Sequence, residues 1–203
     1  IRWFTPKAEV DLCGHATLAT AHVMFEHLNY SGDVITFNSR SGQLKVTKNN
    51  TGLTLDFPKD NYEIIEFPHT LSESFNLKPI QVIKGIMDYV FLYDSQADVE
   101  AAIPNLNVIS KAESRGIIIS APGDEVDFVS RYFAPQFGID EDPVTGSAHT
   151  LLTPYWAHQL GKTEFTAIQL SERVGHLHCV LDADRVKISG QAKTYLVGEI
   201  RLN

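Results

Sequence analysis

The chain has 203 residues, of which 43% are hydrophobic and 21% are charged, with a formal net charge of −8. Its acidic balance argues against a partner held through phosphate contacts, because such binding needs clustered Lys and Arg. No run reaches the ~18 consecutive apolar residues of a membrane helix, and no secretory signal pattern opens the chain. We therefore expect a cytoplasmic globular protein with no nucleic-acid or membrane partner.

The first part of the chain predicts an extended run, a helix and three strands. Residues 1–6 form a β-prone run closed by proline. Residues 14–28 carry small or apolar side chains on nearly all sides at helical spacing, which predicts a deeply buried helix. An antiparallel meander with Asn, Ser and Gly turns should follow. Its strands are expected at 34–37, 42–47 and 52–57.

A proline-flanked acidic stretch at residues 58–68 is the best candidate for a domain boundary. We divide the chain into an incomplete first half, residues 1–62, and a second half, residues 63–203. Whether the last strand belongs to the second half or returns to the first stays open.

The second part predicts more strands around a second long helix. Gly146 opens this helix, Pro154 should kink it or mark a broken first turn, and Gly161 is placed to cap it. A short helix is expected at 96–102. The expected strands cover 81–83, 89–93, 116–120, 127–133, 167–170, 176–181, 185–188 and 194–200.

One larger unit occurs twice: a Phe-x-Pro run, a gap, a glycine-led turn, a buried helix and then strands. The first copy runs from Phe4 through Gly14, and the second from Phe133 through Gly146. The recurrence predicts two pseudo-equivalent halves, each a sheet wrapped around one central helix.

Each glycine-led helix start is a candidate anion site, because free backbone N–H groups and the positive helix end meet there. If the halves face each other, the two starts flank one cleft and hold a carboxylate-bearing substrate, which favours carbanion or enolate chemistry. The candidate substrate-binding residues are Gly14, Ala16, Thr17, Thr145 and Gly146.

Proton transfer beside a carboxylate needs a general acid or base and donors for the developing charge. His15 and Asp142 are the candidate acid/base groups, and Ser147 is a candidate donor to substrate. Each residue also has a structural interpretation. His15 could be satisfied by a backbone carbonyl, Asp142 could form a helix cap or Asx turn, and Ser147 could only cap its helix.

The cysteines and the other histidines support weaker alternatives. Cys13 and Cys179 form no CxxC pair and no disulfide framework. Cys13 could be a thiolate base at a helix start, although a lone cysteine is more often a small core residue. A zinc site using the run from His176 to Cys179 is disfavoured, because on a strand the cysteine points away from the histidines. We predict no metal.

Several motifs resemble the phenazine-biosynthesis-like (PhzF-like) family across nearly the whole chain. They are Arg2-Trp3-Phe4-Thr5-Pro6, residues 9–19 (EVDLCGHATLA), Arg131-Tyr132-Phe133-Ala134-Pro135, residues 141–149 (EDPVTGSAH), residues 154–162, 169–173 and 186–192. The resemblance implies a diaminopimelate-epimerase-like α+β fold, in which each half is a curled antiparallel sheet around a central helix and the active site lies between the halves. It also implies a cofactor-independent isomerase and a homodimer, with His15, Asp142 and Ser147 lining the substrate site.

The chain departs from the family pattern in three places. The family's principal acid/base is a glutamate in a Glu-Thr-Ala-Phe motif upstream of the Trp3-Phe4 run; the sequence lacks this motif, so we expect a chain shortened at its start. The second half has no cysteine near Gly146, which disfavours a two-thiol racemase. Val174 stands where many relatives have glycine, a change expected to be minor.

The leading hypothesis is an isomerase that moves a proton on a small carboxylate-bearing metabolite between the two halves. One alternative is a catalytically silent protein-interaction or metabolite-binding module on the same fold. Another is a serine hydrolase built on Ser147, His15 and Asp142, although the Gly-x-Ser-x-Gly pattern is absent.

Overall fold

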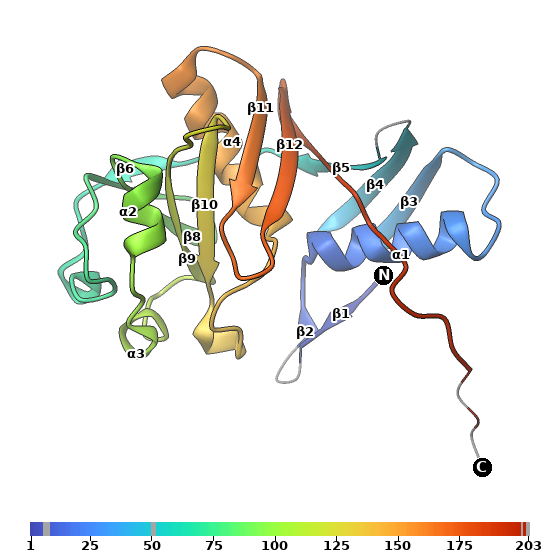
Figure 1. Ribbon diagram of the computed structural model, residues 1–203, viewed down its shortest axis with the longest axis horizontal. Helices are drawn as coiled ribbons and strands as arrows, with labels where there is room; N and C mark the ends of the chain where they lie inside the picture. Colours follow the sequence, from blue (N-terminus) through green and yellow to red (C-terminus); the bar gives the residue numbers. More distant parts are fainter. Residues whose placement is uncertain (6–8, 50–51, 200, 202–203) are drawn as a thin grey trace.

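One long mixed sheet organises the fold (Figure 1). The computed structural model describes residues 1–5, 9–49, 52–199 and 201. A separate small ladder joins β1 (Trp3–Phe4) to β2 (Glu9–Val10). From edge to edge, the long sheet contains β3 (Val34–Ser39), β4 (Gly42–Asn49), β5 (Gly52–Pro58), β13 (Arg185–Gly190), β12 (Gly175–Asp182), β11 (Glu164–Gln169), β10 (Phe128–Phe133), β9 (Gly116–Pro122), β8 (Asp88–Leu92), β7 (Gln81–Lys84) and β6 (Glu63–Ile65).

Helices pack against both faces of this sheet. α1 (Gly14–Glu26) lies against β4 and β5, and α4 (Gly146–Leu160) lies against β12 and β13. α2 (Gln96–Ala101) covers β9 and β10, and is followed by the one-turn α3 (Leu106–Ile109). Short 3₁₀ turns occur at His69–Leu71 and Pro135–Phe137. None of the described helices is long and apolar enough to cross a membrane.

The two helical layers explain the burial of the strands. Every residue of β8 is buried, and its neighbours Val90 and Phe91 point into two different hydrophobic clusters, one on each face of the sheet. β5 instead alternates between buried and partly buried residues, because one face packs on α1 and the other is partly exposed. The described structure is therefore an α+β fold with two central helices, α1 and α4, on one sheet.

Two strand pairs of the long sheet depart from the expected antiparallel arrangement. β8 pairs in parallel with β9, and β10 pairs in parallel with β11. Parallel neighbours need a crossover of a dozen or more residues, usually a helix. The segments that contain α2, α3 and α4 provide these crossovers.

α4 runs without a break through Pro154, so the expected broken first turn is absent. Proline has no N–H to donate to the carbonyl of Thr150, four residues earlier. That carbonyl instead accepts a hydrogen bond from the backbone N–H of Asp60, at 3.1 Å. Gly161 ends the helix in the left-handed conformation (φ 64°), and its N–H donates to the carbonyl of Ala157. The predicted cap is confirmed.

The strand expected at 194–200 is not formed in the described residues of this segment. Residues 191–199 have no secondary structure, and Tyr195 is fully exposed. An alternating sequence makes a strand only where another strand edge lies beside it, and this tail leaves the sheet after β13 (Figure 1). Pro6 and Ile200, at the ends of two expected strands, lie outside the described residues.

β13 pairs with β5 and joins the two parts of the chain in one sheet. The division of the chain at residue 62 stays a prediction.

Candidate active site

The first residues of α1 and α4 touch each other. A Cβ atom on Gly14 would lie 3.3 Å from the Cα of Gly146, with the ring of Phe57 beneath at 3.5 Å. The residues that precede the helices, Cys13 and Thr145, make no side-chain capping bond. The first N–H groups of each helix have no partner within the helix. Two positive helix ends therefore converge on one place.

A cavity of about 570 Å³ opens at this contact. It is lined by residues of both parts of the chain, among them seven of the eight predicted site residues: Gly14, His15, Ala16, Asp142, Thr145, Gly146 and Ser147. The eighth, Thr17, is fully buried and does not line the cavity. Its hydroxyl donates to the carbonyl of Cys13 at 2.6 Å. Because helix phase turns Thr17 into the core, the geometry does not support its predicted contact with substrate.

His15 is exposed at the cavity and reaches across it. Its Nδ1 lies 3.1 Å from the carbonyl oxygen of Val144, and its Nε2 lies 3.6 Å from the Sγ of Cys13. The contact with Cys13 is the largest cause that raises the pKa of His15 to about 9; desolvation opposes it, and the negative charge of Asp142 adds to it. His15 therefore favours the imidazolium form at neutral pH. It has a backbone acceptor, as the structural interpretation expected, and also carries a positive charge into the cavity.

Asp142 is buried in the turn before α4. Its Oδ2 accepts a hydrogen bond from the hydroxyl of Thr145, and its backbone N–H donates to the carbonyl of Tyr132 at 2.9 Å. The fully buried amide of Gln169 donates to the carbonyl of Asp142 at 2.7 Å and accepts from the N–H of Thr145 at 2.7 Å. The turn is thus rigid. Asp142 does not cap the helix, and its Oδ1 has no hydrogen-bond partner among the described residues.

Ser147, the second residue of α4, presents a free hydroxyl. Its Oγ has no hydrogen-bond partner in the described part of the chain, and the residue lines the cavity. The hydroxyl of Thr145, two residues earlier, is engaged with Asp142 and Gln169. Of these two side chains, Ser147 is the one able to donate to a ligand.

The hydrolase alternative is not supported by this geometry. A nucleophilic triad needs a chain of hydrogen bonds from Ser to His to a carboxylate. Among the described residues, no hydrogen bond connects Ser147 with His15 or His15 with Asp142. His15 is engaged with Val144 and Cys13 instead.

The two cysteines considered for a thiolate base and for a zinc site lie in different environments. Cys13 lines the cavity beside His15, whereas Cys179 is fully buried in the core, where burial raises its pKa to about 12. His176 is exposed, and His178 contacts Glu164 at 2.7 Å. In the part of the chain that the structure describes, no three potential metal ligands gather in one place.

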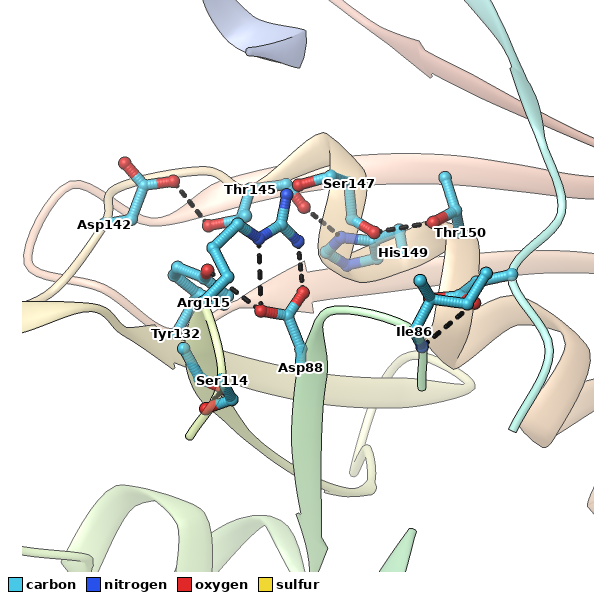
Figure 2. A network of polar contacts seen from close by, with 12 residues as sticks. Ile86, Asp88, Ser114, Arg115, Tyr132, Asp142, Thr145, Ser147, His149 and Thr150 are labelled. Atoms are coloured by element: carbon cyan, nitrogen blue, oxygen red, sulfur yellow. Dashed lines mark hydrogen bonds and ion pairs between the residues drawn. The ribbon is translucent and has the colours of Figure 1, made fainter. Parts of the chain in front are cut away.

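Three polar residues of the cavity region were not predicted from the sequence. Arg115 and Tyr132 line the cavity, and Asp88 lies behind them, 2% exposed. The Nε of Arg115 donates to Asp88 Oδ1 at 3.1 Å, its Nη2 makes a second contact with Oδ2, and the hydroxyl of Tyr132 donates to Oδ1 at 3.1 Å (Figure 2). Burial and the Asp88 carboxylate raise the pKa of Tyr132. No local pattern reveals such a cluster, because its members come from three different strands or strand ends.

Comparison with known proteins gives one consistent answer. Residues 1–198 match the family described as phenazine biosynthesis-like protein (PhzC-PhzF). An uncharacterized isomerase of Pseudomonas aeruginosa is 45% identical over 203 residues, which is 100% of this chain and 78% of that protein. The crystal structure of a PhzF-family phenazine biosynthesis protein of Enterococcus faecalis superposes with a TM-score of 0.93 at 41% identity, covering 99% of this chain and 77% of that one.

The same fold occurs in a more distant protein. A predicted epimerase of Pseudomonas aeruginosa has a TM-score of 0.62 at 18% identity, covering 97% of this chain and 79% of that chain. The fold and its relatives define an isomerase-type enzyme with a diaminopimelate-epimerase-like architecture. Within that class, the chain belongs to the phenazine biosynthesis-like (PhzC-PhzF) family.

Proposed function

We propose that the cavity between α1 and α4 is the place where this isomerase moves a proton on a small carboxylate-bearing metabolite without a cofactor. The observation that carries the proposal is the contact of the two helix starts at Gly14 and Gly146. A carboxylate in the cavity can receive hydrogen bonds from free N–H groups of both helices, and both helix dipoles favour its charge.

The side chains fit proton transfer next to that carboxylate. Removal of a proton from the adjacent carbon places negative charge on the carboxylate oxygens, and the His15 imidazolium and the Ser147 hydroxyl can stabilise it. Asp142 lines the cavity, and its Oδ1, which has no hydrogen-bond partner among the described residues, can take or return the proton. The sequence contains no Glu-Thr-Ala-Phe motif, to which the family resemblance assigns the principal acid/base. His15, Asp142 and Ser147 are then assisting and binding residues.

The experiment is solvent deuterium incorporation, followed by NMR in D₂O, with a panel of cyclic and amino-acid carboxylates. The protein is prepared with a Glu-Thr-Ala-Phe motif where its gene encodes one. His15→Gln should slow the exchange roughly 100-fold, while His178→Gln, at a partly exposed residue that does not line the cavity, should leave it unchanged. Absence of exchange with every compound would overturn the proposal. Binding of a compound without exchange would favour the silent binding module instead. The cytoplasmic location and the homodimer are part of the same proposal.

A further inference from the structure

Arg115 is held in place from several sides at the edge of the cavity. Its backbone N–H donates to the carbonyl of Met87 at 2.7 Å, and the side chain of Gln136 donates to its carbonyl at 2.6 Å. Asp88 then fixes the guanidinium through Nε and Nη2. The side chain keeps 20% of its surface exposed, whereas that of Asp88 keeps 2%. The cation therefore has a fixed position with one side open.

The open side is a complete edge of the guanidinium group. Arginine has five N–H donors in a planar fork, and Asp88 occupies the edge formed by Nε and Nη2. Nη1 has no hydrogen-bond partner among the described residues, and it is not a buried orphan. In Figure 2 this nitrogen points away from Asp88. The edge formed by Nη1 and the second hydrogen of Nη2 can donate two hydrogen bonds to a carboxylate, in the geometry that guanidinium groups favour.

Arg131 shows what a fully structural arginine looks like in the same protein. Its Nε and Nη2 bind Glu141 at 2.7 and 3.0 Å, in the same two-bond arrangement. Its Nη1, however, donates to the carbonyls of Val99 and Ala102, and the residue does not line the cavity. The free edge of Arg115 is thus not needed to hold the fold.

The charges that face the cavity favour an anion. Arg115 and the imidazolium of His15 are positive, and so is Arg2, which also lines the cavity and is paired with Glu9. Asp142 is negative, and the carboxylate of Asp88 lies behind the cavity wall. We propose that Arg115 is a carboxylate-binding residue of this cavity, with Asp88 and Tyr132 as its positioning residues. The inference rests on the proposed function, since it assigns the anchor of the same ligand, and it adds a side-chain donor to the helix N–H groups.

The test is binding of benzoate, with uncharged benzamide as the matched ligand, measured by NMR chemical shifts and calorimetry. Arg115→Gln alone leaves the Asp88 charge buried and unpaired, which risks misfolding. The test variant is therefore the double variant Arg115→Gln/Asp88→Asn, which removes both charges. The matched control is Arg185→Gln/Asp56→Asn, a second Arg–Asp pair, with Nε to Oδ1 at 2.8 Å, between β13 and β5 and away from the cavity.

The test variant should bind benzoate at least tenfold more weakly than the wild type, with benzamide binding unchanged, because charge-assisted hydrogen bonds are lost. The control should bind both ligands as the wild type does. A urea unfolding curve for each protein separates loss of binding from loss of structure. Equal benzoate binding by the test variant, or no benzoate binding by the wild type, would overturn the inference.

The deuterium exchange assay distinguishes a failure of this inference from a failure of the proposed function. Weaker benzoate binding by the test variant, together with a wild type that exchanges no proton, would support the anchor and reject the isomerase mechanism. Proton exchange by the wild type, together with unchanged benzoate binding by the test variant, would support the isomerase mechanism and reject Arg115 as the anchor.

Discussion

Gly14 and Gly146 meet so closely that a Cβ on Gly14 would lie 3.3 Å from the Cα of Gly146. The contact brings two helix starts, 132 positions apart in the sequence, to one cavity. It is not symmetric. A Cβ on Gly146 would lie 3.5 Å from the Cα of Gly14 and 3.8 Å from Phe57, both ordinary contacts.

This asymmetry predicts different outcomes for two equivalent substitutions. Gly14→Ala forces backbone against backbone and should lower the free energy of unfolding by about 1–3 kcal/mol. Gly146→Ala has room, and alanine suits a helix, so its stability should stay within about 0.5 kcal/mol of the wild type. Urea unfolding measures both. Equal losses would show that the helix starts do not meet as described.

The pKa of His15 gives a second prediction. NMR titration should place it near 9, well above the ordinary value of 6.5. Cys13→Ala removes the largest cause, so the pKa should fall toward 6.5. Because the folded-state pKa is the higher one, the stability that it contributes is fully present below pH 6.5 and is lost as pH rises through about 9. A wild-type midpoint near 6.5 would contradict the Cys13–His15 contact.

His149 predicts a pH dependence in a different window. The ring is fully buried, Nδ1–H donates to the carbonyl of Thr145 at 2.9 Å, and burial lowers its pKa to about 4. Below pH 6.5 the unfolded chain binds a proton that the folded protein does not, so stability falls between about pH 6.5 and 4.

His149→Gln removes this titration, and its free energy of unfolding should depend less on pH in that range. The measurement is a urea unfolding series at pH 7.5, 6 and 5. The exposed His176→Gln serves as the control and should retain the wild-type slope. An unchanged slope in His149→Gln would rule out the buried neutral imidazole.

Val174 predicts a stabilising substitution. It has a φ of 52°, in the left-handed region, although it is β-branched, and it is 47% exposed. That backbone costs a branched residue about 1–2 kcal/mol, whereas glycine adopts it freely. This backbone gives a physical reason for the glycine that the family resemblance places here; that the change to valine is minor stays an untested expectation. Val174→Gly should raise the free energy of unfolding by about 1 kcal/mol after the entropy of glycine in the unfolded chain is included.

Glu172→Gly, two residues away and not in the left-handed region, is the matched control and should lose stability. Thermal and urea unfolding of both variants test the point. A Val174→Gly protein less stable than the wild type would show that the side chain contributes more packing than its exposure indicates.

The sequence was informative wherever local chemistry decides the structure. Gly146 and Gly161 bracket the second long helix as predicted, because helix starts and left-handed caps depend on neighbouring residues alone. The recurrence around Gly14 and Gly146 also predicted two equivalent helix starts, which would flank one cleft if the halves faced each other. It did so because both copies carry the same order of elements.

What remained hidden depends on contacts between distant residues. Helical phase within a uniformly apolar helix is hard to assign, so Thr17 was assigned to the cavity although it points into the core. The segment 194–200 has a strand-like pattern, but a pattern does not reveal whether a partner edge is near. Nor does it show whether strands pair in parallel, as β8 and β9 do.

The sequence alone determined the family, the two helix starts and the candidate residues His15, Asp142 and Ser147, because these follow from motifs and local conformation. Only the tertiary structure decided which of the candidates share the cavity and that Arg115 joins them. The pairing of Arg115 with Asp88 spans 27 positions and two strand ends. Its energy comes from a low-dielectric environment that exists only once the sheet has formed.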